Sequence, residues 1–348
     1  MIPLTFRALL LAALASLGWW AHVFAADLSS AGTPAPAGIA VDGEGNVYVS
    51  DYALDRMVKF GPDGSVLSQW GGTGSALGQF NSPFGVAIDA SNTLFVVDQL
   101  NNRVQRFAAD GTALSAWGTA GAAAGDLRTP FGVAVNGGRV YVADFGNDRV
   151  EVFGQDGSLL STLGGRGSGD GQFQRPAGVA VGPDGTLYVT DHFNDRVQRF
   201  NGEGRFQAQL GVPLLAAATA TTTPTPVATA VPTPSVTATP TASTSAGVVD
   251  ANQLRRPEGI VVDRDGDVWV ADYGHDRVVK LAADGRLLLS WGNRGSAPGE
   301  FLGPKGVAID PSTGRVYVAD TGNARVQRLA PDGTPDASWA MPPLQSGS

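Results

Sequence analysis

The segment SPFGVAIDASNTLFVVDQLNNRVQRF, residues 82–107, decides the fold of this chain because the chain repeats its pattern. A Pro-x-Gly opens an apolar run, a turn follows, and a second apolar run ends in an Asp that lies five residues before an Arg-Val. The segment GPKGVAIDPSTGRVYVADTGNARVQRL, residues 303–329, has the same order of features. The glycines of the six Pro-x-Gly motifs are Gly38, Gly85, Gly132, Gly178, Gly259 and Gly306.

Consecutive copies are 46 or 47 residues apart, except for one gap of 81 between Gly178 and Gly259. A fixed period of this length indicates a repeat architecture. Each copy reads as four short strands, and in the third copy these cover residues 131–135, 139–144, 149–153 and 158–163. Gly-containing turns between them supply the positive φ that tight hairpins require. The pattern therefore predicts a four-stranded antiparallel meander in every copy.

Strands such as VYVAD and LFVVD are apolar on both faces, so each sheet must be covered on both sides. Neighbouring sheets can provide that cover if they stack radially in a ring. An open solenoid would leave two apolar ends, and the chain has no polar capping repeat. We predict an all-β, six-bladed β-propeller of four-stranded antiparallel blades, within residues 26–348. The blades are expected near residues 34–81, 82–128, 129–174, 175–211, 255–302 and 303–340.

Residues 1–25 have the features of a secretory signal peptide. Arg7 precedes an apolar run of 13 residues, 8–20, and small residues stand at the spacing a signal peptidase needs. We therefore expect a secreted or cell-envelope protein with no membrane span after cleavage. The alternative is an uncleaved N-terminal membrane anchor, although a bilayer span needs about 20 residues.

The long gap holds one insertion, residues 212–249, which is rich in Thr, Pro and Ala and almost without charge. Such a composition cannot build a core, so a disordered excursion between blades four and five is expected. Because loops of a meander alternate between faces, the insertion leaves from the same face as the turns between each Asp and its Arg. It is either a tolerated surface insertion or a glycosylated stalk or tether for cell-envelope material.

The repeated Pro-x-Gly-Val-Ala-Ile-Asp, Val-Tyr-Val-Ala-Asp and Asn-x-Arg-Val elements resemble the NHL repeat family, over residues 34–340 apart from the insertion. The resemblance implies a six-bladed β-propeller, here a bacterial exported member, that serves as a platform for proteins, sugars or, in some eukaryotic members, RNA. Some relatives are peptidyl-amidating lyases that hold zinc with several histidines at the ring centre.

Charge and composition narrow the function. The chain has 24 Lys and Arg against 32 Asp and Glu, and loss of Arg7 with the signal leaves 23 − 32 = −9. An acidic protein repels phosphate backbones, so nucleic-acid binding is disfavoured. Cysteine is absent, and only His192 and His275 lie beyond the signal, which is too few for a tri-histidine zinc centre. No nucleophile or phosphate-binding motif is present. We predict no catalytic residue, metal or cofactor.

Six acidic residues each precede an arginine by five positions. An Asp and an Arg at this spacing can pair across the same turn and hold it, which explains the repetition without any chemistry. The predicted structural pairs are Asp51 and Arg56, Asp98 and Arg103, Asp144 and Arg149, Asp191 and Arg196, Asp272 and Arg277, and Asp320 and Arg325. Asp263 to Asp267 resembles a calcium loop faintly, but it occupies a hairpin turn and lacks the terminal Glu of an EF-hand.

Positions that vary between copies are the better guide to function, because the scaffold does not dictate them. The residues after each repeated Asp and between Pro and Gly lie on one face of the ring. They are expected to form an exposed aromatic rim that binds a ligand. The predicted binding-face residues are Tyr52, Phe84, Gln99, Phe131, Phe145, His192, Glu258, Tyr273, Lys305 and Thr321. The alternatives are that the aromatics pack on their own loops and that Glu258 pairs with Lys305.

Two functions remain open at this point. The first is a monomeric, non-catalytic scaffold that binds a protein or polysaccharide through the aromatic rim. The second is a lyase or lactone hydrolase with an oxygen-liganded metal in the central channel. A dependence on divalent metal would separate them.

Overall fold

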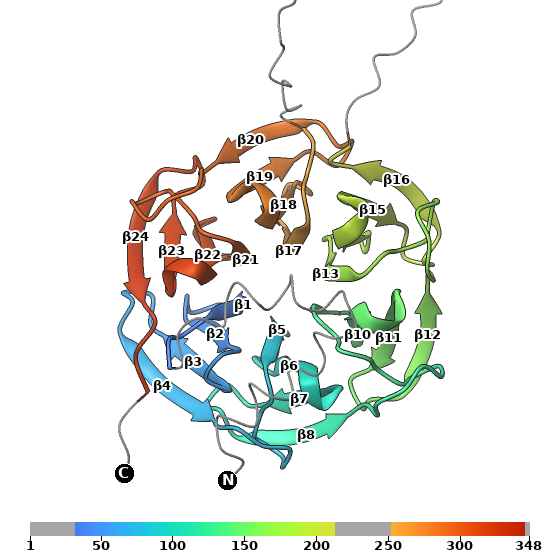
Figure 1. The fold of residues 1–348 in the computed structure, drawn as a ribbon, viewed down its shortest axis with the longest axis horizontal. Coiled ribbons are helices and arrows are strands. Elements are labelled where there is room, and N and C mark those ends of the chain that lie inside the picture. The colour runs from blue at the N-terminus through green and yellow to red at the C-terminus, as the bar shows by residue number, and fades with distance from the viewer. Residues whose placement is uncertain (1–31, 213–251, 345–348) are drawn as a thin grey trace, which may run out of the picture.

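The computed structural model describes residues 32–212 and 252–344. In this part of the chain, 24 strands form six four-stranded antiparallel sheets that are arranged as blades around a central axis (Figure 1). The predicted all-β, six-bladed β-propeller is therefore confirmed. The predicted signal peptide and nearly all of the predicted insertion lie outside the described residues.

In every blade the strands follow one another from the channel outward in sequence order. Blades one to three contain β1 (Pro36–Val41), β2 (Val47–Asp51), β3 (Arg56–Phe60), β4 (Val66–Gly71), β5 (Pro83–Ile88), β6 (Leu94–Asp98), β7 (Arg103–Phe107), β8 (Ala113–Trp117), β9 (Val133–Asn136), β10 (Arg139–Asp144), β11 (Arg149–Gly154) and β12 (Leu159–Leu163). Blades four to six contain β13 (Pro176–Val181), β14 (Leu187–Asp191), β15 (Arg196–Phe200), β16 (Phe206–Leu210), β17 (Pro257–Val262), β18 (Val268–Asp272), β19 (Arg277–Leu281), β20 (Leu287–Trp291), β21 (Pro304–Ile309), β22 (Val316–Asp320), β23 (Arg325–Leu329) and β24 (Pro335–Ala340).

Short 3-10 helices follow the second strand of blades two to six. They are η1 (Gln99–Asn101), η2 (Phe145–Asn147), η3 (His192–Asn194), η4 (Tyr273–His275) and η5 (Thr321–Asn323). The face of the ring that carries these turns and the blade-to-blade loops is called the loop face below, and the other is called the opposite face. No helix of the described residues is long and apolar enough to cross a membrane.

The repeated glycine of each Pro-x-Gly lets the innermost strands approach one another. A methyl group at Gly85 would overlap the carbonyl oxygen of Phe131 in the next blade, and one at Gly132 would overlap that of Ala177. The same contact joins the last blade to the first, because Gly306 lies against the carbonyl oxygen of Ala37. The six glycines therefore set the small radius of the channel. The contact between blades six and one closes the propeller.

The outer strands pack from blade to blade in a similar way. Trp70, Trp117 and Trp291 each lie against the glycine of the next blade's last turn, and that glycine has a positive φ. Trp339 of blade six makes this contact with Gly64 of blade one, which places the last blade on the first. Between the sheets, apolar side chains of neighbouring blades form continuous clusters, such as Val47 and Phe60 of blade one with Tyr317 of blade six.

Among the described strands none is exchanged between the first and last blades, since each sheet is contiguous in sequence. Instead, the segment after β24 occupies the place of a blade-to-blade loop. Met341 is buried in the cluster between blades six and one, and its N–H donates to the carbonyl of Ala324 at 2.9 Å. Arg56 of blade one donates to the carbonyls of Pro342 and Pro343. The C-terminal segment therefore fastens the ring.

We expect Gly85→Ala to lower the free energy of unfolding by about 3 kcal/mol, because the new methyl group would force the inner strands of blades two and three apart. Urea unfolding followed by tryptophan fluorescence measures the change. Gly43→Ala is the matched control, since nothing lies within 4 Å of a methyl group there. Equal effects of the two substitutions would contradict the role assigned to the glycine ring.

We expect Met341→Ala to destabilise the propeller by about 3 kcal/mol, because it empties a buried site at the point of closure. Leu344→Ala, at a side chain that is 55% exposed, should leave the unfolding midpoint within experimental error. If both variants unfold at the wild-type midpoint, the C-terminal segment does not hold the ring closed.

Candidate functional site

All six predicted Asp–Arg pairs are ion pairs on the loop face. Each arginine Nε lies 2.6–3.0 Å from an Oδ2 of its Asp, and all six carboxylates are fully buried. The other carboxylate oxygen accepts a backbone N–H of the chain entering the same blade, as in the 2.7 Å bond from Asn81 to Asp98. The guanidinium then donates to carbonyls of the preceding loop, and Arg103 bonds to those of Ser75, Ala76 and Gln79.

These bonds explain why the residues repeat. One carboxylate and one guanidinium satisfy the polar backbone groups of two chain segments that cross at the edge of each blade. Burial raises the pKa of Asp51, Asp98, Asp144 and Asp191 in spite of the hydrogen bonds and arginines that lower it. The pairs lock loops in place and present no free carboxylate to a substrate.

The predicted rim residues do gather at the loop-face end of the central channel, but they do not form an exposed rim. Nine of the ten are buried, with at most 8% of their surface exposed, and Tyr273 is partly buried. The expectation of exposure was wrong. The inner strands lie so close together that side chains at these positions meet one another across the channel mouth.

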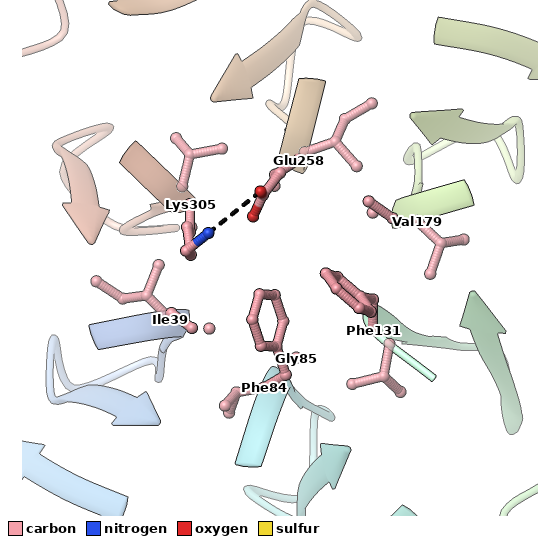
Figure 2. A pocket seen from close by; sticks show the side chains of 18 residues that line it. Ile39, Phe84, Gly85, Phe131, Val179, Glu258 and Lys305 are labelled. Carbon is pink, nitrogen blue, oxygen red and sulfur yellow. Dashed lines mark hydrogen bonds and ion pairs between the residues drawn. The ribbon is translucent and has the colours of Figure 1, made fainter. Parts of the chain in front are cut away.

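Aromatic rings fill one side of this mouth. Phe84 and Phe131 point into the channel, with ring centroids 4.4 Å apart (Figure 2). Phe131 stacks on Phe145 at 4.0 Å, and Tyr52 packs on Phe84 at 5.8 Å. The alternative that the aromatics pack on their own loops describes Phe131 and Phe145 of blade three, whereas Phe84 packs on rings of the two neighbouring blades.

An ion pair occupies the other side of the channel mouth. Lys305 Nζ lies 3.3 Å from Glu258 Oε1, as the dashed line in Figure 2 marks, and both side chains are almost completely buried. The ammonium of Lys305 also lies 4.4 Å from the centroid of the Tyr273 ring. The channel behind is lined by the six repeated glycines and by Val and Ile side chains, and it encloses about 60 Å³.

His192, Gln99 and Thr321 occupy the spaces between neighbouring blades at the mouth. The Thr321 hydroxyl donates to the Pro36 carbonyl at 2.7 Å, and His192 Nδ1 lies 3.3 Å from the Pro257 carbonyl. Burial lowers the pKa of His192 to about 3, and repulsion from Lys305 and Arg256 adds to the shift. The buried amide of Gln99 makes no hydrogen bond with the described residues.

The described residues contain no group of three or more His, Cys, Asp or Glu side chains placed to hold a metal ion. Glu258 is the one carboxylate among the residues lining the described channel, and it faces an ammonium group. His275 bonds to Asp272 at a position where four of the other five blades have an asparagine. In the turn with a faint likeness to a calcium loop, Lys280 Nζ lies 3.0 Å from Asp263 and 2.9 Å from Asp267.

Sequence reasoning missed a set of arginines on the loop face. Arg128 and Arg255 stand two positions before the proline of blades three and five, and Arg175 and Arg256 stand one position before the proline of blades four and five. The equivalent positions in blades two and six hold Asn81, Ser82, Leu302 and Gly303. A comparison of the copies just before each proline, rather than after each Asp, would have found this asymmetry.

The strand order and the glycine ring define the class of this protein as a six-bladed β-propeller. The NHL repeat family model matches residues 127–153, 173–200, 254–281 and 301–329, one segment in each of blades three to six. The chain is an NHL-repeat β-propeller. No curated protein sequence matches it.

Solved structures share the fold at low sequence identity. A catalytically inactive virginiamycin B lyase from Staphylococcus aureus, with quinupristin, has a TM-score of 0.54 and 12% identity over 90% of this chain and 86% of that one. A gluconolactonase from Xanthomonas campestris has a TM-score of 0.57 and 17% identity over 84% of each chain. Hydrazine synthase from Kuenenia stuttgartiensis has a TM-score of 0.55 and 13% identity over 86% of this chain and 96% of that one. At these identities the likeness shows the fold alone.

The buried neutral His192 predicts a pH dependence of stability. Its pKa is about 3 in the native chain against 6.5 as the ordinary value, so the unfolded chain binds the extra proton as the pH falls below 6.5. This group's contribution is therefore present above pH 6.5 and is lost as the pH falls toward 3. Between pH 7 and pH 5 the loss amounts to about 2 kcal/mol.

We expect His192→Phe, which places the residue of blade three in blade four, to reduce the drop in unfolding free energy between pH 7 and pH 5 by about that amount. Urea denaturation at the two pH values measures it. His275→Asn, which restores the residue of most other blades, serves as the control. A His192→Phe variant with the wild-type pH dependence would show that this imidazole is not buried in its neutral form.

Proposed function

We propose that this chain is an exported, non-catalytic binding or scaffolding module that engages a protein or a glycan through its loop face. The observation that carries the proposal is the filled channel mouth. At its centre the rings of Phe84 and Phe131 contact each other, and Lys305 forms an ion pair with Glu258. A ligand that approaches this face would therefore contact the surrounding loops and turns rather than groups deep in the channel.

The loops around the mouth offer groups suited to binding. Leu77 and Leu100 are exposed on blades one and two. Arg128 and Arg255 are exposed on blades three and five, and Arg166 is exposed in the loop between blades three and four. The Asp–Arg pairs hold all of these loops rigidly, so little conformational entropy would be lost when a partner binds. Rigid loops on a stable scaffold are a common arrangement for recognition.

The alternative of a lyase or lactone hydrolase receives less support. A reaction in the channel requires reactive groups open to substrate, and the carboxylate there is paired while the imidazole of His192 is buried. The fold of the virginiamycin B lyase and of the gluconolactonase is shared by propellers of many functions, so it does not carry an activity to this chain.

Export is proposed from residues 1–25, whose charged start, apolar run and small residues are typical of a secretory signal. The protein would act outside the cytoplasm, either secreted or at the cell envelope, and as a monomer. An uncleaved signal would instead serve as an N-terminal anchor and would keep the propeller at the membrane surface.

Because the chain contains no cysteine, one face can be blocked at a time. Ser168→Cys on the loop face and Glu203→Cys on the opposite face are both at exposed positions. Each variant would be made as a protein of residues 26–348, and its single cysteine would be labelled with a maleimide polyethylene glycol. Binding to immobilised dextran, polygalacturonate and gelatin would be measured by biolayer interferometry, with and without EDTA. We expect at least one probe to bind. Labelling at position 168 should lower its affinity by about tenfold or more, and EDTA should leave the affinity unchanged.

Labelling at position 203 provides the matched control and should leave binding intact. Binding that is blocked from position 203 but not from position 168 would contradict the proposal, as would a failure to bind any of the three probes. Hydrolysis or elimination of a lactone substrate that EDTA abolishes would instead support the enzymatic alternative.

A further inference from the structure

Arginines that stand just before the prolines are concentrated in one half of the loop face, which is called the basic half below. Of the two positions before each blade's proline, blades three to five hold four arginines, and blades two and six hold none. Arg166, in the loop between blades three and four, adds a fifth to this basic half. The chain as a whole carries a net charge of −8, so the arrangement is not a general property of its surface. Members of the basic half are Arg128, Arg166, Arg175, Arg255 and Arg256.

Contacts place these side chains on the surface of the turns. The stem of Arg128 lies across Gly146 of η2, and that of Arg255 lies across Gly274 of η4, each close enough to collide with a methyl group there. The guanidinium of Arg175 lies 5.4 Å from the centroid of Phe145 and donates to the Phe145 carbonyl at 3.3 Å.

The arginines are close enough to repel one another. Burial is the largest cause of a lowered pKa at Arg175, and repulsion from Arg128 and Arg166 adds to it, against the attraction of Asp148. Arg256 contributes in the same way to the lowered pKa of His192. Among the described residues, Arg128, Arg166, Arg255 and Arg256 form no ion pair with a carboxylate. A cluster of like charges on one surface raises the local concentration of anions there.

A partly exposed aromatic ring lies near Phe145, the ring that Arg175 overlies. Phe193 of η3 packs edge-on against His192 at 4.8 Å and near Phe145 at 6.4 Å, while part of its surface remains open. Arg175 precedes it on blade four, and Arg256 belongs to the next blade. A partly exposed aromatic ring near a guanidinium group can stack on the apolar face of a sugar ring while the guanidinium binds its acidic substituent.

We propose that the basic half of the loop face binds an acidic polysaccharide, a chain of pyranose units that carry carboxylates. The arginines recur from blade to blade, which suits a polymer whose charges also recur, and each planar guanidinium can pair with a carboxylate through two hydrogen bonds. A nucleic acid is disfavoured because it needs a more extensive basic surface than these five arginines provide. This inference rests on the proposed binding function and specifies its ligand.

The test compares polygalacturonate with dextran, poly-L-glutamate and single-stranded DNA, using residues 26–348 and isothermal titration calorimetry at low and moderate salt. We expect polygalacturonate to bind best of the four. Arg128→Ala combined with Arg255→Ala should weaken its binding by about tenfold and reduce its dependence on salt. Phe193→Ala should weaken binding by about fivefold and leave the salt dependence unchanged, because it removes a stacking surface and no charge.

Arg264→Ala combined with Arg286→Ala is the matched control, since it removes the same charge from exposed positions on the opposite face. Thermal melting would verify that every variant is folded. Equal weakening by the two double variants would overturn the proposal, because net charge alone would then explain the effect. Tighter binding of poly-L-glutamate or of DNA would also overturn it, in favour of an acidic polypeptide or a nucleic acid.

The failure of this inference can be separated from failure of the proposed function. If labelling at position 168 blocks a probe whose affinity the arginine variants do not change, the loop face binds a ligand but not through its basic half. If polygalacturonate binds and the label at position 168 has no effect, both proposals fail.

Discussion

The structure depends on the close approach of six inner strands, which the absence of a side chain at one position per blade permits. Each of these glycines lies against a carbonyl of the next blade, so no larger residue fits without widening the ring. In blade one the Ser50 hydroxyl accepts the N–H of Gly38 at 2.8 Å and donates to the Phe84 carbonyl at 2.5 Å, and in blade four Thr190 bonds likewise to Gly178 and Glu258. In blade two, the Gly85 N–H donates directly to Phe131. The inner ring thus satisfies its polar backbone groups while keeping the channel narrow.

The second constraint is the passage of the chain from one blade to the next. A propeller must pass its chain from the outermost strand of one blade to the innermost strand of the next, across a face where no sheet supplies hydrogen bonds. The repeated Asp and Arg supply them, with the carboxylate holding the incoming chain and the guanidinium holding the loop behind it. At the site of the long insertion Arg277 reaches the carbonyl of Gln253, so the chain returns to the usual path directly after the interruption. At the closure, Arg56 holds the C-terminal segment in the place of a loop.

The narrow channel has a consequence for function. Variable residues that would face solvent around a wider opening meet one another instead, and they form a mixed aromatic and ionic plug. If the loop face binds a ligand as proposed, the ligand would contact the residues just before each proline and the turns beside them. These positions are free to differ between blades because the Asp–Arg pairs already fix the backbone. At the two positions before the proline, blades three to five carry arginines, whereas blades one, two and six carry Pro and Ala, Asn and Ser, and Leu and Gly, respectively.

Much of the molecule could be read from the sequence. The 46–47-residue period, the hairpin turns and strands that are apolar on both faces determined a six-bladed propeller, and the spacing of Asp and Arg determined that they would pair, because these features are local and recur. The set of residues at the channel mouth could also be named, since strand parity places them on one face. Their exposure could not be predicted from the sequence, because burial at the mouth depends on the radius of the ring, which is a property of the six blades together. The tertiary structure alone decided that Phe84 meets Phe131, that Lys305 meets Glu258, and that arginines from three blades share one surface, since each contact joins residues from different repeats.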